Sequence, residues 1–123
     1  MPERGTTFSP GLLTLSRWQQ YQRVFDDVAA EREAQVAQWG DQQLPFGTGS
    51  AQDQLLARAY RDTTQKHDAD GTVTWRDVLL EEVFEAMAES DPGKLRDELV
   101  QVLAVGTKMI EDIDRNATEG AHV

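Results

Sequence analysis

The chain has 123 residues, of which 39% are hydrophobic and 28% are charged, and it contains no cysteine. This composition indicates one ordinary globular domain and excludes disulfides, thiolate nucleophiles and thiolate zinc sites. The formal net charge of -10 disfavours duplex nucleic acid and anionic membranes as partners. No apolar run approaches the ~20 residues that span a bilayer, and no signal-peptide pattern is found, so we expect a cytoplasmic protein without membrane contact.

The first half of the sequence predicts an arm and two helices. Residues 1–15 show no periodicity and are predicted to form a flexible N-terminal arm. Ser16 is a candidate N-cap for a first helix, because apolar residues recur at helical spacing over residues 18–39. After a turn-rich segment, a second helix is expected at residues 51–66, with Ser50 as its N-cap.

The segment after the second helix has part of the spacing of a calcium-binding loop. Asp68, Asp70 and Gly71 match the third, fifth and sixth positions of an EF-hand loop. The end positions do not match, because Lys66 stands at the first position and Asp77 replaces the bidentate glutamate at the twelfth. We therefore interpret the segment as a plain turn that leads into a capped helix.

The second half of the sequence predicts two helices joined by a tight connection. Thr74 and Asp77 are close to a capping box, and they introduce a third helix over residues 75–89. Asp91 is a candidate N-cap for a fourth helix, which extends to about Arg115.

The fold class that these elements predict is all-α. We expect a four-helix bundle in one domain over residues 16–115, with an antiparallel hairpin joining the last two helices and a flexible tail at 116–123. Apolar residues occupy more than one face of these helices, including both sides of the fourth. The chain is therefore predicted to form a homodimer or a homotetramer.

Glutamates cluster on one face of the third predicted helix. Glu82, Glu85 and Glu89 lie three and four residues apart and share a helix face, with Glu81 about a quarter-turn aside. Like charges at this spacing repel each other by a few tenths of a kcal/mol per pair. The acidic face is therefore either solvated or offset by a cation.

The fourth predicted helix carries a second pair of oxygen ligands. Glu98 and Gln101 are also three residues apart, and the tight connection folds their helix back against the third. Two such pairs on facing helices can converge on a hard divalent ion, because Mg²⁺ takes about six oxygen ligands near 2.1 Å. The sequence therefore predicts a site for Mg²⁺ or Mn²⁺.

The two pairs resemble the signature of a known family. The stretches EEVFEA and DPGKLRDELVQVLAV resemble the ExxE and ExxD motifs of the MazG-like all-α nucleoside triphosphate pyrophosphohydrolases. In this resemblance Glu82 and Glu85 form the first motif and Glu98 begins the second, and the likeness extends over residues 28–115. One position departs from the family, because Gln101 stands in place of an aspartate and brings an amide oxygen without a charge.

The resemblance implies an activity and a role for each of these residues. The reaction would be the Mg²⁺-dependent hydrolysis of a nucleoside triphosphate to a monophosphate and pyrophosphate. The metal ligands that it implies are Glu82, Glu85, Glu98 and Gln101. Glu81 or one of these ligands would act as general base, and Lys108 would meet a terminal phosphate. The alternatives are a weakly active or inactive nucleotide-binding or regulatory protein of the same fold, and a structural helical protein whose acidic face meets a basic partner.

Four further residues are candidates for substrate contact. Trp39 and Trp75 lie beside helix ends, where they could stack on a base or anchor loops on the core. Lys94 shares a stripe with the first acid of the fourth helix and could reach an acid on the third. Asp112 lies further along a similar face and could compensate for the missing aspartate.

Overall fold

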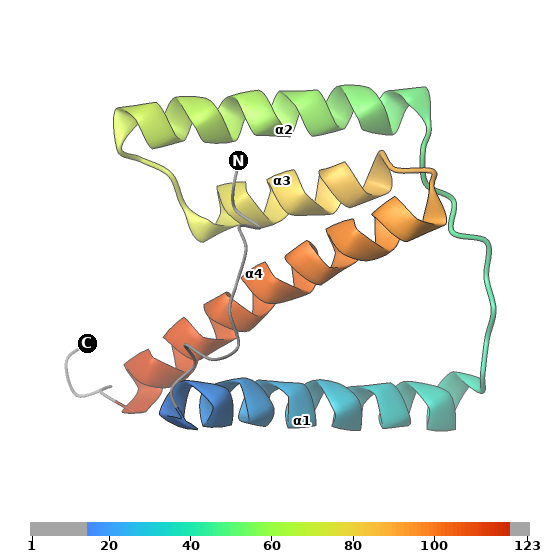
Figure 1. The fold of residues 1–123 in the computed structure, drawn as a ribbon, viewed down its shortest axis with the longest axis vertical. Helices are drawn as coiled ribbons and strands as arrows, with labels where there is room; N and C mark the ends of the chain where they lie inside the picture. The colour runs from blue at the N-terminus through green and yellow to red at the C-terminus, as the bar shows by residue number, and fades with distance from the viewer. Residues whose placement is uncertain (1–14, 119–123) are drawn as a thin grey trace. The chain divides into compact units, whose positions relative to one another are not determined.

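The computed structural model describes residues 15–118, and in this range it has four α-helices and no strand (Figure 1). The helices are α1 (Leu15–Trp39), α2 (Ala51–Asp70), α3 (Trp75–Met87) and α4 (Pro92–Thr118). The all-α class and the four helices are therefore confirmed for the described residues. None of these helices is long and apolar enough to cross a membrane.

The described residues fall into two compact units. The first unit comprises residues 46–109 and holds α2, α3 and the N-terminal part of α4. The second unit comprises residues 15–45 and 110–118, and it holds α1 and the end of α4.

Helix α1 begins before the residue that was expected to cap it. Ser16 is already helical, so the prediction that it is an N-cap is wrong. The predicted arm also lies mostly outside the described residues, which begin with Leu15 at the start of the helix. At the other end, Gly40 adopts a positive φ of 76° and donates its N–H to the Val36 carbonyl at 2.8 Å. This left-handed residue ends α1 as a glycine C-cap does.

Helix α2 is longer than its sequence predicted. The Ser50 hydroxyl accepts the N–H of Asp53 at 3.0 Å, which confirms the N-cap. The helix continues to Asp70 instead of ending near Lys66, so the two aspartates of the calcium-like stretch lie on its last turn. Gly71 then ends the helix with a φ of 74°. The glycine decides this boundary, because the aspartates before it do not interrupt backbone hydrogen bonding.

Helix α4 has the predicted start and a later end. The Asp91 carboxylate accepts the N–H of Lys94 at 2.9 Å, and its carbonyl accepts the N–H of Leu95 at 2.8 Å. Asp91 therefore caps the helix as expected. Residues 116–118 are helical, although they were predicted to be part of a flexible tail, and the rest of that tail lies outside the described residues.

Helices α2 and α3 pack against each other in the first unit. Ala57 on α2 and Val78 and Ala86 on α3 are buried, and the rings of Tyr60 and Phe84 stack with centroids 4.6 Å apart and an interplanar angle of 13°. Such a stacked pair contributes about 1 kcal/mol beyond the area that it buries. Small residues thus allow the two helices to approach closely, and the aromatic pair fixes their register.

A strap formed by Thr48 and Gly49 joins the start of α2 to the end of α3. The Thr48 hydroxyl donates to the Glu89 carbonyl at 2.6 Å, and the Gly49 N–H donates to the Met87 carbonyl at 2.8 Å. These bonds satisfy carbonyls that a helix end leaves without intrahelical partners. Gly49 has a φ of 94°, and a Cβ built on it would lie 2.6 Å from the Cβ of Ser90, so only glycine fits here.

A polar clamp formed by Thr64, His67, Thr74 and Asp77 joins the other ends of the same two helices. The Thr64 hydroxyl is buried and donates to the carbonyls of Tyr60 at 2.9 Å and Asp77 at 3.1 Å. The His67 Nδ1 lies 2.9 Å from the Asp77 carboxylate. Thr74 and Asp77 complete the predicted capping box, each bonding the other's backbone N–H. The clamp therefore fixes the α2–α3 connection through side chains as well as backbone.

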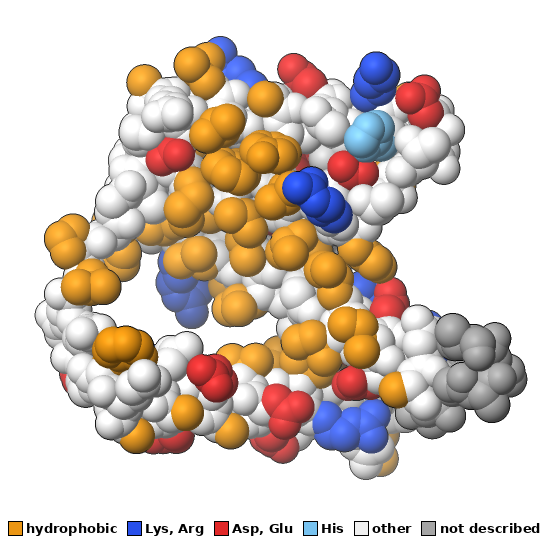
Figure 2. Space-filling view, turned by 180° about the vertical axis from the view of Figure 1, so that it is seen from behind, with side chains coloured by type: hydrophobic (Ala, Val, Ile, Leu, Met, Phe, Trp, Pro, Cys, Tyr) orange, Lys and Arg blue, Asp and Glu red, His pale blue; other side chains and the backbone are white. Residues whose placement is uncertain are grey.

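Hydrophobic side chains remain exposed in both units. Figure 2 shows them gathered over the helices of the first unit. On the part of α4 in this unit the exposed ones are Leu99, Val100 and Leu103. In the second unit, Val24 is the one buried side chain of α1, whereas Trp18, Phe25 and Val28 are about half exposed. Apolar faces of this extent favour association with another surface.

Candidate metal centre

Three glutamates from two helices meet in the first unit. Glu82 and Glu85 lie one turn apart on α3, so their side chains leave the helix on the same side. The short connection between α3 and α4 brings Glu98 to them from the first turns of α4. One carboxylate oxygen from each residue lies within 4.8 Å of the other two. We refer to these three residues as the triad.

The triad is largely withdrawn from solvent. Glu82 is 1% exposed, and its neighbour Glu81 is 0% exposed. The Glu85 side chain is 20% exposed. Glu98 is half-buried, and its Oε2 atom is buried and accepts no hydrogen bond from the described residues. A solvated acidic face does not describe this arrangement, because two adjacent glutamates of α3 are among its most buried residues.

The electrostatics of the triad favour uptake of positive charge. Burial raises the pKa of Glu82 to about 7, and the negative charges of Glu85, Glu81 and Glu98 act in the same direction. Burial also raises the pKa of Glu98, with Glu85 as the largest contributing charge. Protons can supply the missing positive charge below neutral pH. A bound cation can supply it above neutral pH.

The donor set of the triad fits a hard divalent cation. Its three ligands are carboxylate oxygens, which Mg²⁺, Mn²⁺ and Ca²⁺ prefer over nitrogen or sulfur. With metal–oxygen distances near 2.1 Å, neighbouring oxygens of a Mg²⁺ octahedron lie about 3.0 Å apart and opposite oxygens about 4.2 Å apart. Separations of up to 4.8 Å are therefore close to the required spacing, and small side-chain rotations would complete it. Three protein ligands leave the other positions for water or phosphate oxygens.

Arg61 of α2 is a member of this region that the sequence reasoning missed. Its Nε lies 3.5 Å from Oε1 of Glu85, and its positive charge opposes the raised pKa of Glu98. One signal was present in the sequence, because Arg61 has no acidic residue three or four positions before or after it on its helix. An arginine without a local partner on a helix indicates a partner on another element.

The other predicted ligands and catalytic groups lie on the same helices at different distances along them. Gln101 is half-buried and follows Glu98 by one turn of α4, as the predicted pair requires. Lys108 follows Glu98 by ten residues, which is about 15 Å along a helix axis. Glu81 is buried beside Glu82 and raises its pKa. The structure thus brings three glutamates together and leaves Lys108 further along the helix.

The four candidates for substrate contact are divided between the two units. Trp75 is the first residue of α3 and precedes Glu82 by seven residues, about 10 Å along the axis. Lys94 is exposed on the first turn of α4. Trp39 and Asp112 belong to the second unit, so their roles in substrate binding stay predictions.

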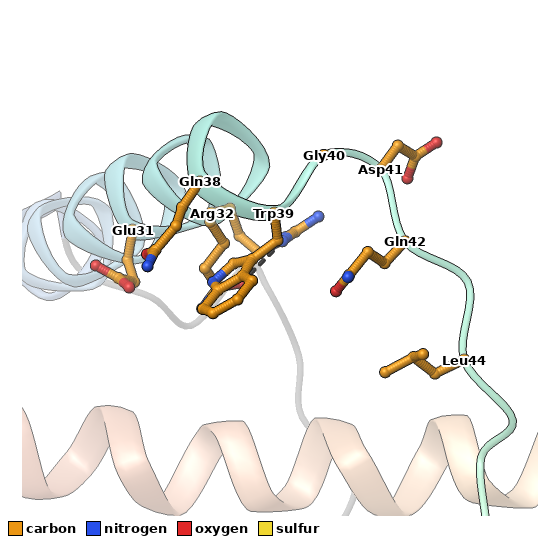
Figure 3. A pocket seen from close by; sticks show the side chains of 9 residues that line it. Glu31, Arg32, Gln38, Trp39, Gly40, Asp41, Gln42 and Leu44 are labelled. Atoms are coloured by element: carbon orange, nitrogen blue, oxygen red, sulfur yellow. Dashed lines mark hydrogen bonds between the residues drawn. The ribbon is translucent and has the colours of Figure 1, made fainter.

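A separate pocket lies in the second unit at the end of α1. Its volume is about 400 Å³, and Figure 3 shows the side chains of Gln42 and Leu44 pointing back toward Trp39 from the segment that follows the helix. Trp39 is 59% exposed. It therefore does not anchor this segment on a core in the described residues. Stacking on a planar ligand stays the prediction for it.

Comparisons with known proteins identified no relative of this chain. No family model, no curated protein and no solved structure matches the sequence. The geometry and burial of Glu82, Glu85 and Glu98 therefore carry the functional conclusion.

Proposed function

We propose that the protein is a Mg²⁺-dependent nucleoside triphosphate pyrophosphohydrolase. It cleaves a ribo- or deoxyribonucleoside triphosphate between the α and β phosphates and releases a monophosphate and pyrophosphate. The observation that carries this proposal is the convergence of Glu82, Glu85 and Glu98 from two helices within 4.8 Å. The resemblance of the same residues to the MazG-like signature supports the reaction class.

The buried acids would have two roles, which are to bind the cation and to accept a proton from water. Mg²⁺, with Mn²⁺ as a substitute, would neutralise the phosphates and lower the pKa of the attacking water. Glu82, Glu85 and Glu98 would hold the ion, and Gln101 would add a neutral amide oxygen. A general base has to be able to accept a proton from the attacking water. Glu81 is the candidate for this role, because it is buried beside Glu82 and is not one of the three ligands.

One specific observation favours a second candidate function. Gln101 supplies no charge where the MazG-like signature has an aspartate, and a site with three carboxylates holds a divalent ion less tightly than a site with four. The second candidate is a protein of the same fold that binds nucleotides with little or no turnover. A structural helical protein is favoured less, because burial of Glu81 and Glu82 is not what an acidic contact surface requires.

The proposal includes a fold and an assembly. We expect the four helices to form a MazG-like bundle, and we expect copies of the chain to associate as a dimer or a tetramer. Exposed Leu99, Val100 and Leu103 on α4 support association, because an apolar stripe in water is stabilised when a second surface covers it. A cytoplasmic location fits a nucleotide substrate.

Pyrophosphate release tests the activity directly. The purified chain is incubated with a panel of nucleoside and deoxynucleoside triphosphates in Mg²⁺, Mn²⁺ or a chelator, and pyrophosphate and monophosphate are quantified together. We expect release with either ion, none with the chelator, and none from Glu82→Gln. Glu33→Gln, which removes an equal charge from an exposed position on α1, should retain the wild-type rate.

Each other outcome of this assay supports a different conclusion. Nucleotide binding without pyrophosphate release would support the second candidate. Neither binding nor release would support a structural protein. Release that Glu82→Gln leaves unchanged would separate the activity from the triad and overturn the site.

A further inference from the structure

Arg61 lies at the edge of the triad with most of its hydrogen-bonding capacity unused. Its Nε is 3.5 Å from Glu85 Oε1, and the guanidinium donates no hydrogen bond to the described residues. The side chain is 44% exposed. An arginine that is committed to a carboxylate normally makes two parallel, short hydrogen bonds. Arg61 and Glu85 therefore form a loose ion pair that costs little to separate.

The charge of Arg61 acts on more than its nearest neighbour. It opposes the raised pKa of Glu98 as well as contacting Glu85, so it offsets part of the charge of two triad members. A divalent cation held by the same carboxylates would repel the guanidinium. The guanidinium and the cation therefore compete for Glu85, and binding of the cation favours release of Arg61.

Arg61, once released, has the chemistry to bind the anion that the cation attracts. A guanidinium presents a planar set of donors that matches the oxygens of a phosphate group. Arg61 reaches Glu85 from α2, whereas Glu98 approaches the triad from α4, so the guanidinium and the third ligand meet Glu85 from different helices. A phosphate that shares the cation with Glu85 would lie within reach of this side chain.

We propose that Arg61 is an exchangeable counter-ion, which pairs with Glu85 in the cation-free protein and transfers to a phosphate of the substrate when the triad holds Mg²⁺. The inference rests on the proposed function and assigns a residue to substrate binding at the same site. It makes Arg61 a substrate-binding residue that no motif in the sequence marks. It also predicts two effects of opposite sign when the charge is removed.

Mg²⁺ binding to the substrate-free protein tests the first effect. Calorimetry compares the wild type with Arg61→Gln, Arg61→Lys and Arg58→Gln. Arg58 lies one turn earlier on α2, is exposed and makes no ion pair in the described residues, so its variant controls for total charge. We expect Arg61→Gln to bind Mg²⁺ at least about threefold more tightly, whereas Arg61→Lys and Arg58→Gln stay within about twofold of the wild type.

Binding of inorganic triphosphate in saturating Mg²⁺ tests the second effect. This probe carries the phosphates of any nucleoside triphosphate without a base or sugar. We expect Arg61→Gln to bind it about tenfold more weakly, which is the loss of one charge-assisted hydrogen-bonded contact. The triphosphate affinity of Arg61→Lys should lie between those of the wild type and Arg61→Gln, because lysine keeps the charge and loses the planar donor set. A merely structural role for Arg61 would not produce gains and losses of opposite sign.

The outcomes separate this inference from the proposed function. Unchanged or weaker Mg²⁺ binding in Arg61→Gln, or unchanged binding of triphosphate, overturns the counter-ion role. If the wild type binds both ligands but releases no pyrophosphate, the pyrophosphohydrolase proposal fails and the two binding tests of Arg61 still decide the inference. If the wild type binds no Mg²⁺, the proposed function and the inference both fail.

Discussion

The first turn and the middle of α3 carry carboxylates in opposite electrostatic surroundings. Near the N-terminus, Asp77 is almost buried and accepts hydrogen bonds from Thr74, and it lies 2.9 Å from the His67 ring. Five residues after Asp77, Glu82 is buried beside Glu81 in the triad region. The same short helix therefore contains an acid with hydrogen-bond donors around it and an acid that is buried among other acids.

The pKa values of the two acids express this difference. The hydrogen bond with His67, followed by that with the Thr74 backbone, lowers the pKa of Asp77 from its ordinary 3.8. Burial and three neighbouring negative charges raise the pKa of Glu82 to about 7. Hydrogen-bond donors from the fold stabilise the charged form of a carboxylate and lower its pKa. Neighbouring acids destabilise the charged form, and a proton or a cation relieves this repulsion. The direction of the pKa shift thus separates an acid whose charge the fold stabilises from an acid whose charge is destabilised by burial and by its acidic neighbours.

Metal affinity should show the largest contrast between Asp77 and the triad glutamates. Removing an outer-sphere partner of a metal site costs about 10- to 100-fold in affinity, so removing a direct ligand should cost at least about 100-fold. We expect this loss of Mg²⁺ affinity in Glu85→Gln, measured by calorimetry well below the unfolding temperature. Asp77→Asn should bind Mg²⁺ like the wild type. Equal losses in the two variants would contradict the division of α3 into two kinds of acid.

The pH dependence of stability should change sign between the two acids. The folded protein binds a proton at Glu82 more tightly than the unfolded chain, so this stabilisation is complete below about pH 4.5 and is lost as the pH rises through 7. The loss is at most about 3 kcal/mol. Asp77 acts oppositely, because its contribution is present above about pH 3.8 and is lost as the pH falls. Urea unfolding from pH 3 to pH 8 measures both limbs.

Added Mg²⁺ provides the control for that measurement. At pH 8 the ion should recover stability that ionisation of Glu82 removes, because it binds the folded state alone. At pH 5, where a proton occupies the same region, the gain should be much smaller. A Mg²⁺ gain of equal size at both pH values would show that Glu82 does not titrate at the site.

Neutralising each acid should shift stability in opposite directions. At pH 8 without Mg²⁺, Glu82→Gln should raise the free energy of unfolding by roughly 1 to 2 kcal/mol, because it removes a buried charge and keeps the side-chain shape. Asp77→Asn should lower the free energy of unfolding, because it removes the negative charge that accepts hydrogen bonds from His67 and from the Thr74 N–H of the capping box. Thermal melting of the two variants in parallel tests this. Destabilisation by both variants would indicate that Glu82 is also a structural acid.

A smaller effect should follow from loss of the N-cap hydroxyl at the structural end. Thr74→Ala removes the acceptor of the Asp77 N–H and should cost about 1 kcal/mol. Thr74→Ser keeps the hydroxyl and should retain most of that stability. Neither variant should change Mg²⁺ affinity, which calorimetry on the folded proteins can check.

Local signals in the sequence predicted most of the helix starts. Ser50, Thr74 and Asp91 each place a side-chain oxygen where it can accept an orphan N–H, and the structure has all three as caps. Helix α2 extends past its predicted end because Gly71, and not the two aspartates before it, ends the helix. Helix α1 begins before its predicted start because Ser16 is also compatible with a helix interior. An N-cap side chain bonds a backbone N–H two or three residues later in the chain, so the sequence alone can reveal it.

The candidate site was predictable only where its residues obey helix spacing. Glu82, Glu85 and Glu98 follow from two helical repeats and a tight connection, and the structure brings them together. Arg61 and the burial of Glu81 depend on how α2 packs across α3, and no spacing within one helix reveals that. Packing between helices is set by shape over many side chains, so sequence periodicity gives the face of a helix but not what covers it.

The strap and the clamp have a consequence for the speed of any exchange at Arg61. The strap holds the residues just before α2 to the end of α3, and the clamp holds the last turns of α2 to the start of α3. Because α2 is fastened at both ends, Arg61 has to leave Glu85 by rotating its own side chain while the helices stay in place. Rotations of exposed side chains take picoseconds to nanoseconds, far less than the time of a typical catalytic cycle. Such an exchange would therefore be too fast to limit turnover by the proposed enzyme, and the rate would instead reflect bond cleavage or departure of the products.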